Sequence, residues 1–274
     1  MKAAVQAGLC VVGSVVEQRS VGPDGFVLEL EIPNMPAVMP PGAFAMLSPE
    51  DGSGPEIPRP FSIYDRLSAT RFTFLIQTLG RGTKAIEKVA VGEEMRITMP
   101  LGNGFEVAPA ARTVVMVAGG VGSAPFLLYA KERAALGASE NTHMLFGART
   151  EERLYDRQAF EAVAVDLHLA TDDGTLGFHG NVVACLADLL DAGKLPTDAL
   201  FLACGPAGLL HGFAAFARER DLCAVLSLET YMGCGFGVCN ACPVPTNPEG
   251  PLGAWPYART CTEGPIFPLS SIQF

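Results

Sequence analysis

Cysteine is the residue type whose spacing says most in this chain. The segment "GCGFGVCNAC" holds three cysteines with the spacing C-x4-C-x2-C, and a fourth follows in "ARTCTEGPIF". The four are Cys234, Cys239, Cys242 and Cys261. This is the ligand spacing of plant-type [2Fe–2S] clusters, whose iron is held by cysteine thiolates. Gly235 and Gly237 lie between the first two cysteines, and glycine permits the unusual backbone angles that a loop around such a cluster needs. The cysteines therefore predict a [2Fe–2S] site.

Two other readings of the same cysteines stay open. A structural zinc site also uses four thiolates, but it usually offers two closely spaced pairs, whereas Cys261 has no near partner in the sequence. Disulfides are the second alternative, and a cluster of thiols in an intracellular chain favours metal over disulfides. The remaining cysteines, Cys10, Cys185, Cys204 and Cys223, are scattered among apolar residues and are predicted to be small buried side chains.

Glycine-rich turns mark two candidate nucleotide contacts. "AGGVGSAP" follows an apolar run and precedes a helical pattern, so Gly120, Gly122 and Pro125 would lie where a strand-to-helix turn presents free N–H groups to a pyrophosphate. The turn departs from the usual dinucleotide fingerprint, and a plain tight turn is the alternative. "CGPAGLL" also ends an apolar run and opens a helix, which places Cys204, Gly205 and Pro206 at the sheet edge where open α/β sheets bind ligands.

Two segments earlier in the chain carry candidate flavin contacts. In "RPFSIYD", Arg59 could pair with a phosphate through two hydrogen bonds, and Ser62 could donate to a flavin nitrogen. An ordinary barrel strand with a surface arginine is the alternative. In "LGRGTKAI", the N–H groups and Thr83 begin a short helix that could meet a second phosphate.

The other polar residues offer no conventional catalytic set. The four histidines, His143, His168, His179 and His211, form no ligand-like pair in the sequence, and none is assigned a catalytic role. We find neither a nucleophile–base pair nor a pair of carboxylates. A protein whose chemistry resides in its cofactors needs none of these.

Charge and hydropathy exclude some partners. The formal net charge of −10 makes nucleic acid an unlikely partner. No apolar run reaches the ~18 residues of a membrane span. The valine-rich N-terminus is interpreted as a first strand rather than a signal peptide, which predicts a cytoplasmic protein.

The elements that would position these residues fall into three parts. Residues 1–108 hold short alternating or β-branched runs separated by glycine and proline, which predict an antiparallel β-barrel. Residues 109–228 alternate apolar runs with helical patterns, which predict a Rossmann-like parallel sheet covered on both faces. Residues 229–274 are loop-rich and carry the cysteine cluster as a small third region.

In this order, the motifs resemble the ferredoxin–NADP⁺ reductase superfamily, and within it the electron transfer subunits of NAD-dependent dihydroorotate dehydrogenases. The resemblance covers essentially the whole chain. It is carried by "LETYMGCGFGVCNACPVP" and "CTEGPIF", supported by "RPFSI", "LGRGT", "PLGNGF", "TDDGTLGFHGNV" and "CGPAG". The stretch between Cys242 and Cys261 is longer than the family leads us to expect, and Ser123 replaces an expected apolar residue.

The resemblance implies a role for each matching residue. FAD would be bound by Arg59, Pro60, Phe61, Ser62, Ile63, Gly82 and Thr83. The nicotinamide dinucleotide would be bound by Gly120, Gly122, Pro125, Cys204, Gly205 and Pro206. The [2Fe–2S] cluster would be bound by Cys234, Cys239, Cys242 and Cys261.

The function implied by the resemblance is electron transfer. Electrons from an FMN-containing dihydroorotate dehydrogenase catalytic subunit would pass through the [2Fe–2S] cluster and FAD to NAD⁺, in pyrimidine biosynthesis and within a heterotetramer. Related subunits with the same layout oxidise NAD(P)H for a hydrogenase or belong to ferredoxin-dependent NADP⁺ reductases, and these are the alternative. A zinc-stabilised binding module without catalysis is an alternative from another class.

Overall fold

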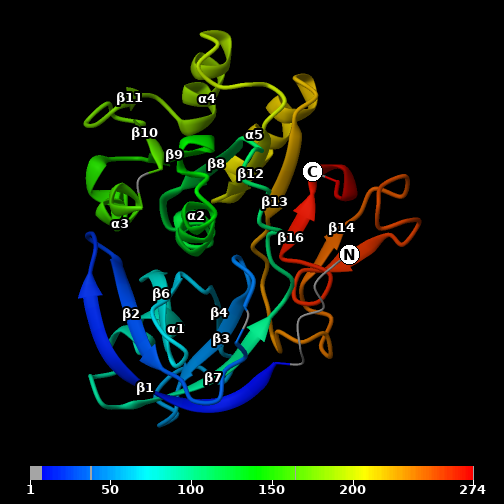
Figure 1. Cartoon of the computed structure of the whole chain (residues 1–274). Coiled ribbons are helices and arrows are strands. Elements are labelled where there is room, and N and C mark those ends of the chain that lie inside the picture. The colour runs from blue at the N-terminus through cyan, green and yellow to red at the C-terminus, as the bar shows by residue number, and fades with distance from the viewer. Residues whose placement is uncertain (1–7, 38, 164, 274) are drawn as a thin grey trace.

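The computed structural model describes residues 8–37, 39–163 and 165–273. These residues form two seven-stranded sheets and a two-stranded sheet, arranged as a barrel, an α/β layer structure and a C-terminal region beside them (Figure 1). The predicted first strand begins at Leu9, and the part of that prediction that falls on residues 1–7 lies outside the described residues. No helix in the described ranges is long and apolar enough to cross a membrane.

The first sheet is antiparallel and confirms the predicted barrel. Its strands are β1 (Leu9–Ser20), β2 (Gly25–Glu31), β3 (Phe44–Pro49), β4 (Arg59–Ser62), β5 (Asp65–Arg66), β6 (Arg71–Gln77) and β7 (Glu94–Leu101), with helix α1 (Arg81–Glu87) before β7. The strand order is β4-β3-β7-β1-β2-β6-β5. Only Ile63 and Tyr64 separate β4 from β5 in the chain, although these strands lie at opposite edges, so the sheet must curl round on itself. Leu28, Leu30 and Phe74 alternate along their strands to fill its interior.

The second sheet confirms the predicted parallel sheet. Its strands are β8 (Val114–Gly119), β9 (Thr142–Ala148), β10 (Asp166–Thr171), β11 (Phe178–His179), β12 (Leu200–Cys204), β13 (Cys223–Ser227) and β16 (Ile266–Pro268). The helices are α2 (Phe126–Ala135), α3 (Arg157–Ala162), α4 (Val182–Asp191) and α5 (Ala207–Glu219). Helices α2 and α3 pack on one face of the sheet, and α4 and α5 pack on the other. Short 3-10 helices lie at Gly120–Ser123, Ser139–Asn141, Glu151–Arg153 and Leu269–Ser271.

The strand order of this sheet predicts where a ligand binds. The order is β11-β10-β9-β8-β12-β13-β16, so the chain moves outward in one direction after β8 and in the other direction after β12. Open α/β sheets bind their ligands at the carboxyl ends of the strands at such a reversal. The two glycine-rich turns directly follow β8 and β12.

The C-terminal region is joined to the second sheet. Strands β14 (Pro243–Pro245) and β15 (Tyr257–Arg259) form the two-stranded antiparallel sheet. The chain then enters β16, which pairs antiparallel with β13 and extends the parallel sheet by one strand (Figure 1). Sequence analysis did not predict these three strands.

Candidate functional site

Two of the four clustered cysteines, Cys242 and Cys261, are brought together by the β14–β15 hairpin. Cys242 directly precedes β14, and β14 pairs with β15 so that Pro243 lies opposite Arg259. The N–H of Thr260 donates to the carbonyl oxygen of Cys242 at 2.9 Å, which brings the next residue, Cys261, alongside. The Sγ atoms of Cys242 and Cys261 lie 3.3 Å apart, and both residues are buried. The long stretch between these two cysteines thus extends and closes a hairpin, so it does not separate the thiols.

The loop that carries Cys234 and Cys239 has the backbone predicted for it. Gly235 and Gly237 have φ values of 81° and 90°, in the left-handed region that favours glycine. The N–H of Cys239 donates to Sγ of Cys234 at 3.5 Å. Burial raises the pKa of Cys234, but the N–H groups of Cys239, Phe236 and Val238 together lower it to about 6. The loop therefore stabilises the thiolate, which is the form that binds metal.

The buried half of this set fits a group that supplies positive charge. Burial and the adjacent Cys242 raise the pKa of Cys261 to about 12. Two buried thiols at this separation cannot both ionise without a cation beside them, because the like charges repel in a medium of low dielectric constant. All four cysteines are free thiols. The donor set of four thiols, with N–H groups directed at one of them, fits an iron–sulfur cluster.

The cysteines outside this set differ in exposure. Cys185 is buried and Cys204 is half-buried, whereas Cys10 and Cys223 are exposed. The prediction that the scattered cysteines are buried is therefore wrong for two of them. Cys10 and Cys223 lie at or next to the first residues of β1 and β13, where the side chains point to solvent.

The cysteine loop, residues 234–242, packs directly on the barrel together with Cys261. Phe44, Met46 and Leu101 of β3 and β7 form one buried apolar group with Cys242 and Cys261. Gly235 lies so close to this group that an added Cβ would be 2.6 Å from Cγ of Met46. The lack of a side chain at Gly235 therefore allows the loop to approach the barrel wall.

The candidate flavin residues lie at one end of β4 and at the start of α1. Gly82 is buried against Arg59, and an added Cβ there would be 2.8 Å from Nε of the arginine. Nη1 of Arg59 donates to the carbonyl oxygen of Ile57 at 2.7 Å. The Thr83 hydroxyl accepts from the N–H groups of Leu79 and Gly80 and so closes the first turn of α1. These contacts place Arg59, Gly82 and Thr83 together.

The other members of the predicted flavin set lie along β4. Pro60, Phe61 and Ser62 are half-buried, so part of each side chain is accessible. Ile63 has no exposed surface and belongs to the barrel core. The Ile63 side chain therefore holds the strand in position and does not reach a ligand.

The two glycine-rich turns meet at the carboxyl edge of the second sheet. Gly122 packs so tightly on the end of β12 that an added Cβ would be 2.5 Å from the carbonyl oxygen of Cys204 and 2.5 Å from Cα of Gly205. Gly120 has a φ of +54°. Pro125 and Pro206 are the N-cap residues of α2 and α5. The predicted nucleotide residues from both turns are thus brought together.

The thiol of Cys204 stays protonated at neutral pH. Burial raises its pKa to about 12, although a hydrogen bond with Ser227 acts in the opposite direction. A protonated thiol is a weak nucleophile, so the structure gives Cys204 a packing role at this edge and not a covalent one.

Sequence analysis missed a polar contact, centred on the buried Asp156, that joins the barrel to the α/β part. Asp156 has 6% of its surface exposed and accepts two hydrogen bonds from Arg19, at 2.9 and 3.0 Å. It also accepts from the Tyr64 hydroxyl at 2.9 Å. Asp156 lies 137 positions from Arg19 and 92 positions from Tyr64, so local sequence carries no signal for this contact. The contact fixes the barrel relative to the nucleotide turns.

Two family models match parts of this chain. Residues 229–273 match the model of the iron–sulfur cluster binding domain of dihydroorotate dehydrogenase B. Residues 116–214 match the model of the oxidoreductase NAD-binding domain. The first match covers all four clustered cysteines, and it favours iron–sulfur over the zinc and disulfide alternatives.

Solved structures share the fold. A solved structure of an NADH-dependent reduced ferredoxin–NADP oxidoreductase matches with a TM-score of 0.81 and 24% identity, covering 95% of this chain and 89% of that chain. The ferredoxin reductase in carbazole 1,9a-dioxygenase matches with a TM-score of 0.64 and 18% identity, covering 78% and 67%. At these identities the likeness concerns the fold, which is that of ferredoxin reductases.

Curated relatives are similar over nearly their whole length. A protein of Bacillus mycoides named dihydroorotate dehydrogenase B (NAD(+)), electron transfer subunit is 31% identical over 263 residues, covering 94% of this chain and 96% of that protein. A protein of the same name from Desulforamulus reducens is 29% identical over 250 residues, covering 90% and 92%. Together with the cysteine loop and the reductase fold, this similarity shows that the chain belongs to the family of dihydroorotate dehydrogenase B (NAD(+)) electron transfer subunits.

Proposed function

We propose that this chain transfers electrons from a dihydroorotate dehydrogenase catalytic subunit to NAD⁺. The finer parts of the proposal are that the catalytic subunit carries FMN, that the two proteins form a heterotetramer, and that the complex works in the cytoplasm. Free thiols at all eight cysteines agree with a reducing compartment.

The observation that carries the proposal is the short path from the cysteine loop to β4. Phe44 and Met46 pack against the buried cysteines Cys242 and Cys261. In the pairing of β3 with β4, Phe44 lies opposite Ser62 and Met46 lies opposite Pro60. Paired residues share one face of a sheet, and neighbouring strands are about 4.8 Å apart. The cysteines and the candidate flavin strand are thus separated by a single strand.

The residues of the barrel are suited to hold FAD. Arg59 can form charge-assisted hydrogen bonds with a pyrophosphate, and the close packing of Gly82 leaves room for it. Pro60, Phe61 and Ser62 present backbone and side-chain groups to a flavin ring. In the same way, Gly120, Gly122, Pro125, Cys204, Gly205 and Pro206 form the edge where NAD⁺ would bind.

The division of tasks between the two kinds of cofactor follows from their chemistry. A bound iron–sulfur cluster exchanges single electrons, whereas a flavin exchanges one or two and can reduce NAD⁺ by hydride transfer. The protein's contribution is to bind and orient these groups. The N–H groups around Cys234 and the burial of Cys242 and Cys261 are the means by which this chain would tune the cluster's potential.

An exposed apolar surface beside the cysteine loop is the proposed docking site of the catalytic subunit. Phe236 is 54% exposed and Val238 is 74% exposed, which is unusual for large apolar side chains on one short loop. Within the "PVP" segment after Cys242, Val244 does not belong to this surface, because β14 turns it inward and buries it with the core of the second sheet.

Reconstitution tests the proposed function. The chain alone, loaded with FAD and its cluster, should reduce an artificial dye with NADH and should not oxidise dihydroorotate. Addition of a dihydroorotate dehydrogenase catalytic subunit from the same organism should give dihydroorotate-dependent reduction of NAD⁺. Oxidation of dihydroorotate by this chain alone, or coupling only to a hydrogenase or to ferredoxin, would overturn the proposal.

A further inference from the structure

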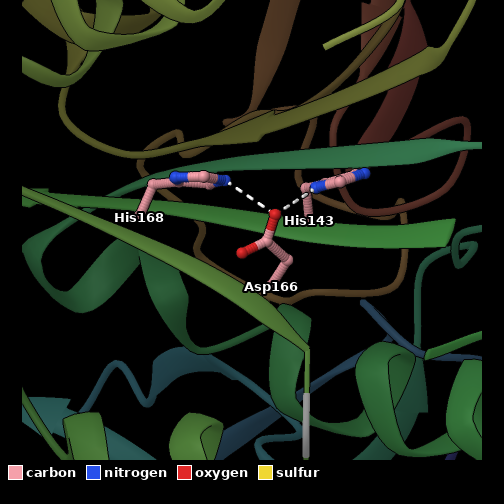
Figure 2. A group of neighbouring side chains, drawn as sticks. All are labelled: His143, Asp166 and His168. Atoms are coloured by element: carbon pink, nitrogen blue, oxygen red, sulfur yellow. Dashed lines mark hydrogen bonds and ion pairs between the residues drawn. The ribbon is translucent and has the colours of Figure 1, made fainter. Parts of the chain in front are cut away.

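Three polar side chains meet at the amino ends of two neighbouring strands of the second sheet. The glycine-rich turns lie at the opposite, carboxyl ends of the strands. His143 is the second residue of β9, and Asp166 and His168 are the first and third residues of β10. The two strands are parallel and pair Asp166 with His143. Because side chains alternate along a strand, all three lie on the same face of the sheet, as Figure 2 shows. The sequence alone shows no ligand-like pair of histidines, because His143 and His168 lie 25 positions apart and only the strand register brings them together.

The potential ligand atoms of the three residues converge on a small space. Nδ1 of His143 lies 2.9 Å from Oδ2 of Asp166, and Nε2 of His168 lies 3.0 Å from the same oxygen (Figure 2). One ligand atom from each residue lies within 4.8 Å of the other two. The two imidazole rings are nearly parallel, at an interplanar angle of 22°. Bonds of about 2.1 Å in the tetrahedral arrangement usual for zinc would separate neighbouring ligand atoms by about 3.4 Å, somewhat more than the present 2.9 and 3.0 Å.

The surroundings leave the site accessible on one side. On this face of the sheet, Leu145 and Ala170 belong to the apolar core under α4 and α5. Towards the start of the strands the cover ends, and Asp166 is 54% exposed in its side chain, against 14% for His143. The two histidines thus pack at the margin of the core, while the carboxylate of Asp166 is exposed to solvent. Such a site offers three protein ligands and an open position for water.

We propose that His143, Asp166 and His168 bind a divalent transition metal ion of the zinc type, through Nδ1, Oδ2 and Nε2. Imidazole nitrogens select such ions over Mg²⁺ and Ca²⁺, which prefer oxygen ligands throughout. The bound ion would join the start of β9 to the start of β10. This is where β10 lacks a second neighbour, because β11 pairs only with Ala170 and Thr171 in the described part of the chain.

Zinc binding should be measured on protein whose iron–sulfur cluster is loaded, so that the four clustered thiols are occupied. After dialysis against micromolar ZnCl₂, the parent protein should retain one zinc per chain by elemental analysis, and zinc should raise its melting temperature. The double variant His143→Gln/His168→Gln should lose that zinc. His179→Gln, a histidine of the neighbouring strand β11 outside the site, is the matched control and should retain it.

Asp166→Asn separates metal binding from simple hydrogen bonding, and it guards against a double variant that does not fold. An asparagine oxygen can still accept a hydrogen bond from either histidine but is a poorer metal ligand. The variant should therefore keep its fold and lose at least tenfold in zinc affinity. Equal zinc retention by the parent and the double variant, or unchanged zinc affinity in Asp166→Asn, would overturn the proposal. Iron content and dye reduction report separately on the proposed electron transfer.

Discussion

The four clustered cysteines have different surroundings, but they are expected to act as one ligand set. Cys234 and Cys239 lie on a loop whose N–H groups favour the thiolate, whereas Cys242 and Cys261 lie buried side by side. Four thiolates are the usual complete ligand set of a plant-type cluster. Loss of any one should therefore affect the whole cluster.

Cys239→Ser should lose or shift the EPR signal of the reduced [2Fe–2S] cluster, because a serine oxygen is a harder and more weakly matched ligand for iron. The measurement is iron content and EPR after anaerobic purification, with two irons per chain expected in the parent. Cys223→Ser is the matched control, since Cys223 is an exposed thiol on β13. An unchanged signal in Cys239→Ser would remove this residue from the ligand set.

Arg59→Ala should weaken FAD binding by about 10- to 150-fold, because hydrogen bonds to charged groups contribute roughly 1.5–3 kcal/mol. The measurement is a fluorescence titration of the FAD-free protein. Arg96→Ala is a suitable control, since it removes another barrel arginine, one that forms an ion pair with Glu50. If both variants bind FAD as the parent does, Arg59 is not a phosphate ligand.

At the scale of elements, the contact between the turn after β8 and the end of β12 determines the backbone shape of the proposed NAD⁺ site. Gly122→Ala would place a methyl group against the backbone of Cys204 and Gly205, and backbone cannot move aside as a flexible side chain can. The KM for NADH in the dye assay should rise, by up to about 100-fold if the turn shifts by an ångström. Gly208→Ala, in α5 with open space around it, should leave the KM unchanged. A folded Gly122→Ala protein with the parental KM would contradict this account.

Local sequence patterns predicted most elements and most candidate site residues. The cysteine spacing, the glycine-rich turns and the alternating runs are local signals, and they led to the barrel, the parallel sheet and the cysteine loop. Contacts set by distant pairing were not predictable in this way. The β14–β15 hairpin, the contact of Tyr64 and Arg19 with Asp156, and the meeting of His143 with Asp166 and His168 all depend on register between separate strands or parts.

At the scale of the whole molecule, the surface beside the cysteine loop should govern assembly and not the chain's own reductase activity. Phe236→Ser/Val238→Ser should weaken association with the catalytic subunit roughly tenfold or more, because large apolar side chains at the centre of an interface contribute most of its free energy. Dye reduction by NADH should be retained. The measurement is analytical ultracentrifugation of the mixed subunits beside the dye assay.

Leu136→Ser is the control for that double variant. Leu136 is 54% exposed, like Phe236, but follows α2 in the α/β part. It should leave association unchanged. Equal affinity in the Phe236/Val238 variant and the parent would place the docking surface elsewhere on the molecule.

The pairing of β16 with β13 has a consequence for how the chain can be shortened. A two-part reductase made by truncation after Leu228 would lose β16, and the N–H and C=O groups of β13 that now bond to residues 266–268 would face solvent. An unpaired edge strand of apolar sequence, such as "CAVLS", is a template for intermolecular strand addition. Removal of the iron–sulfur region should therefore yield a protein that self-associates. The C-terminal region thus also covers the edge of the second sheet and prevents other chains from pairing with β13.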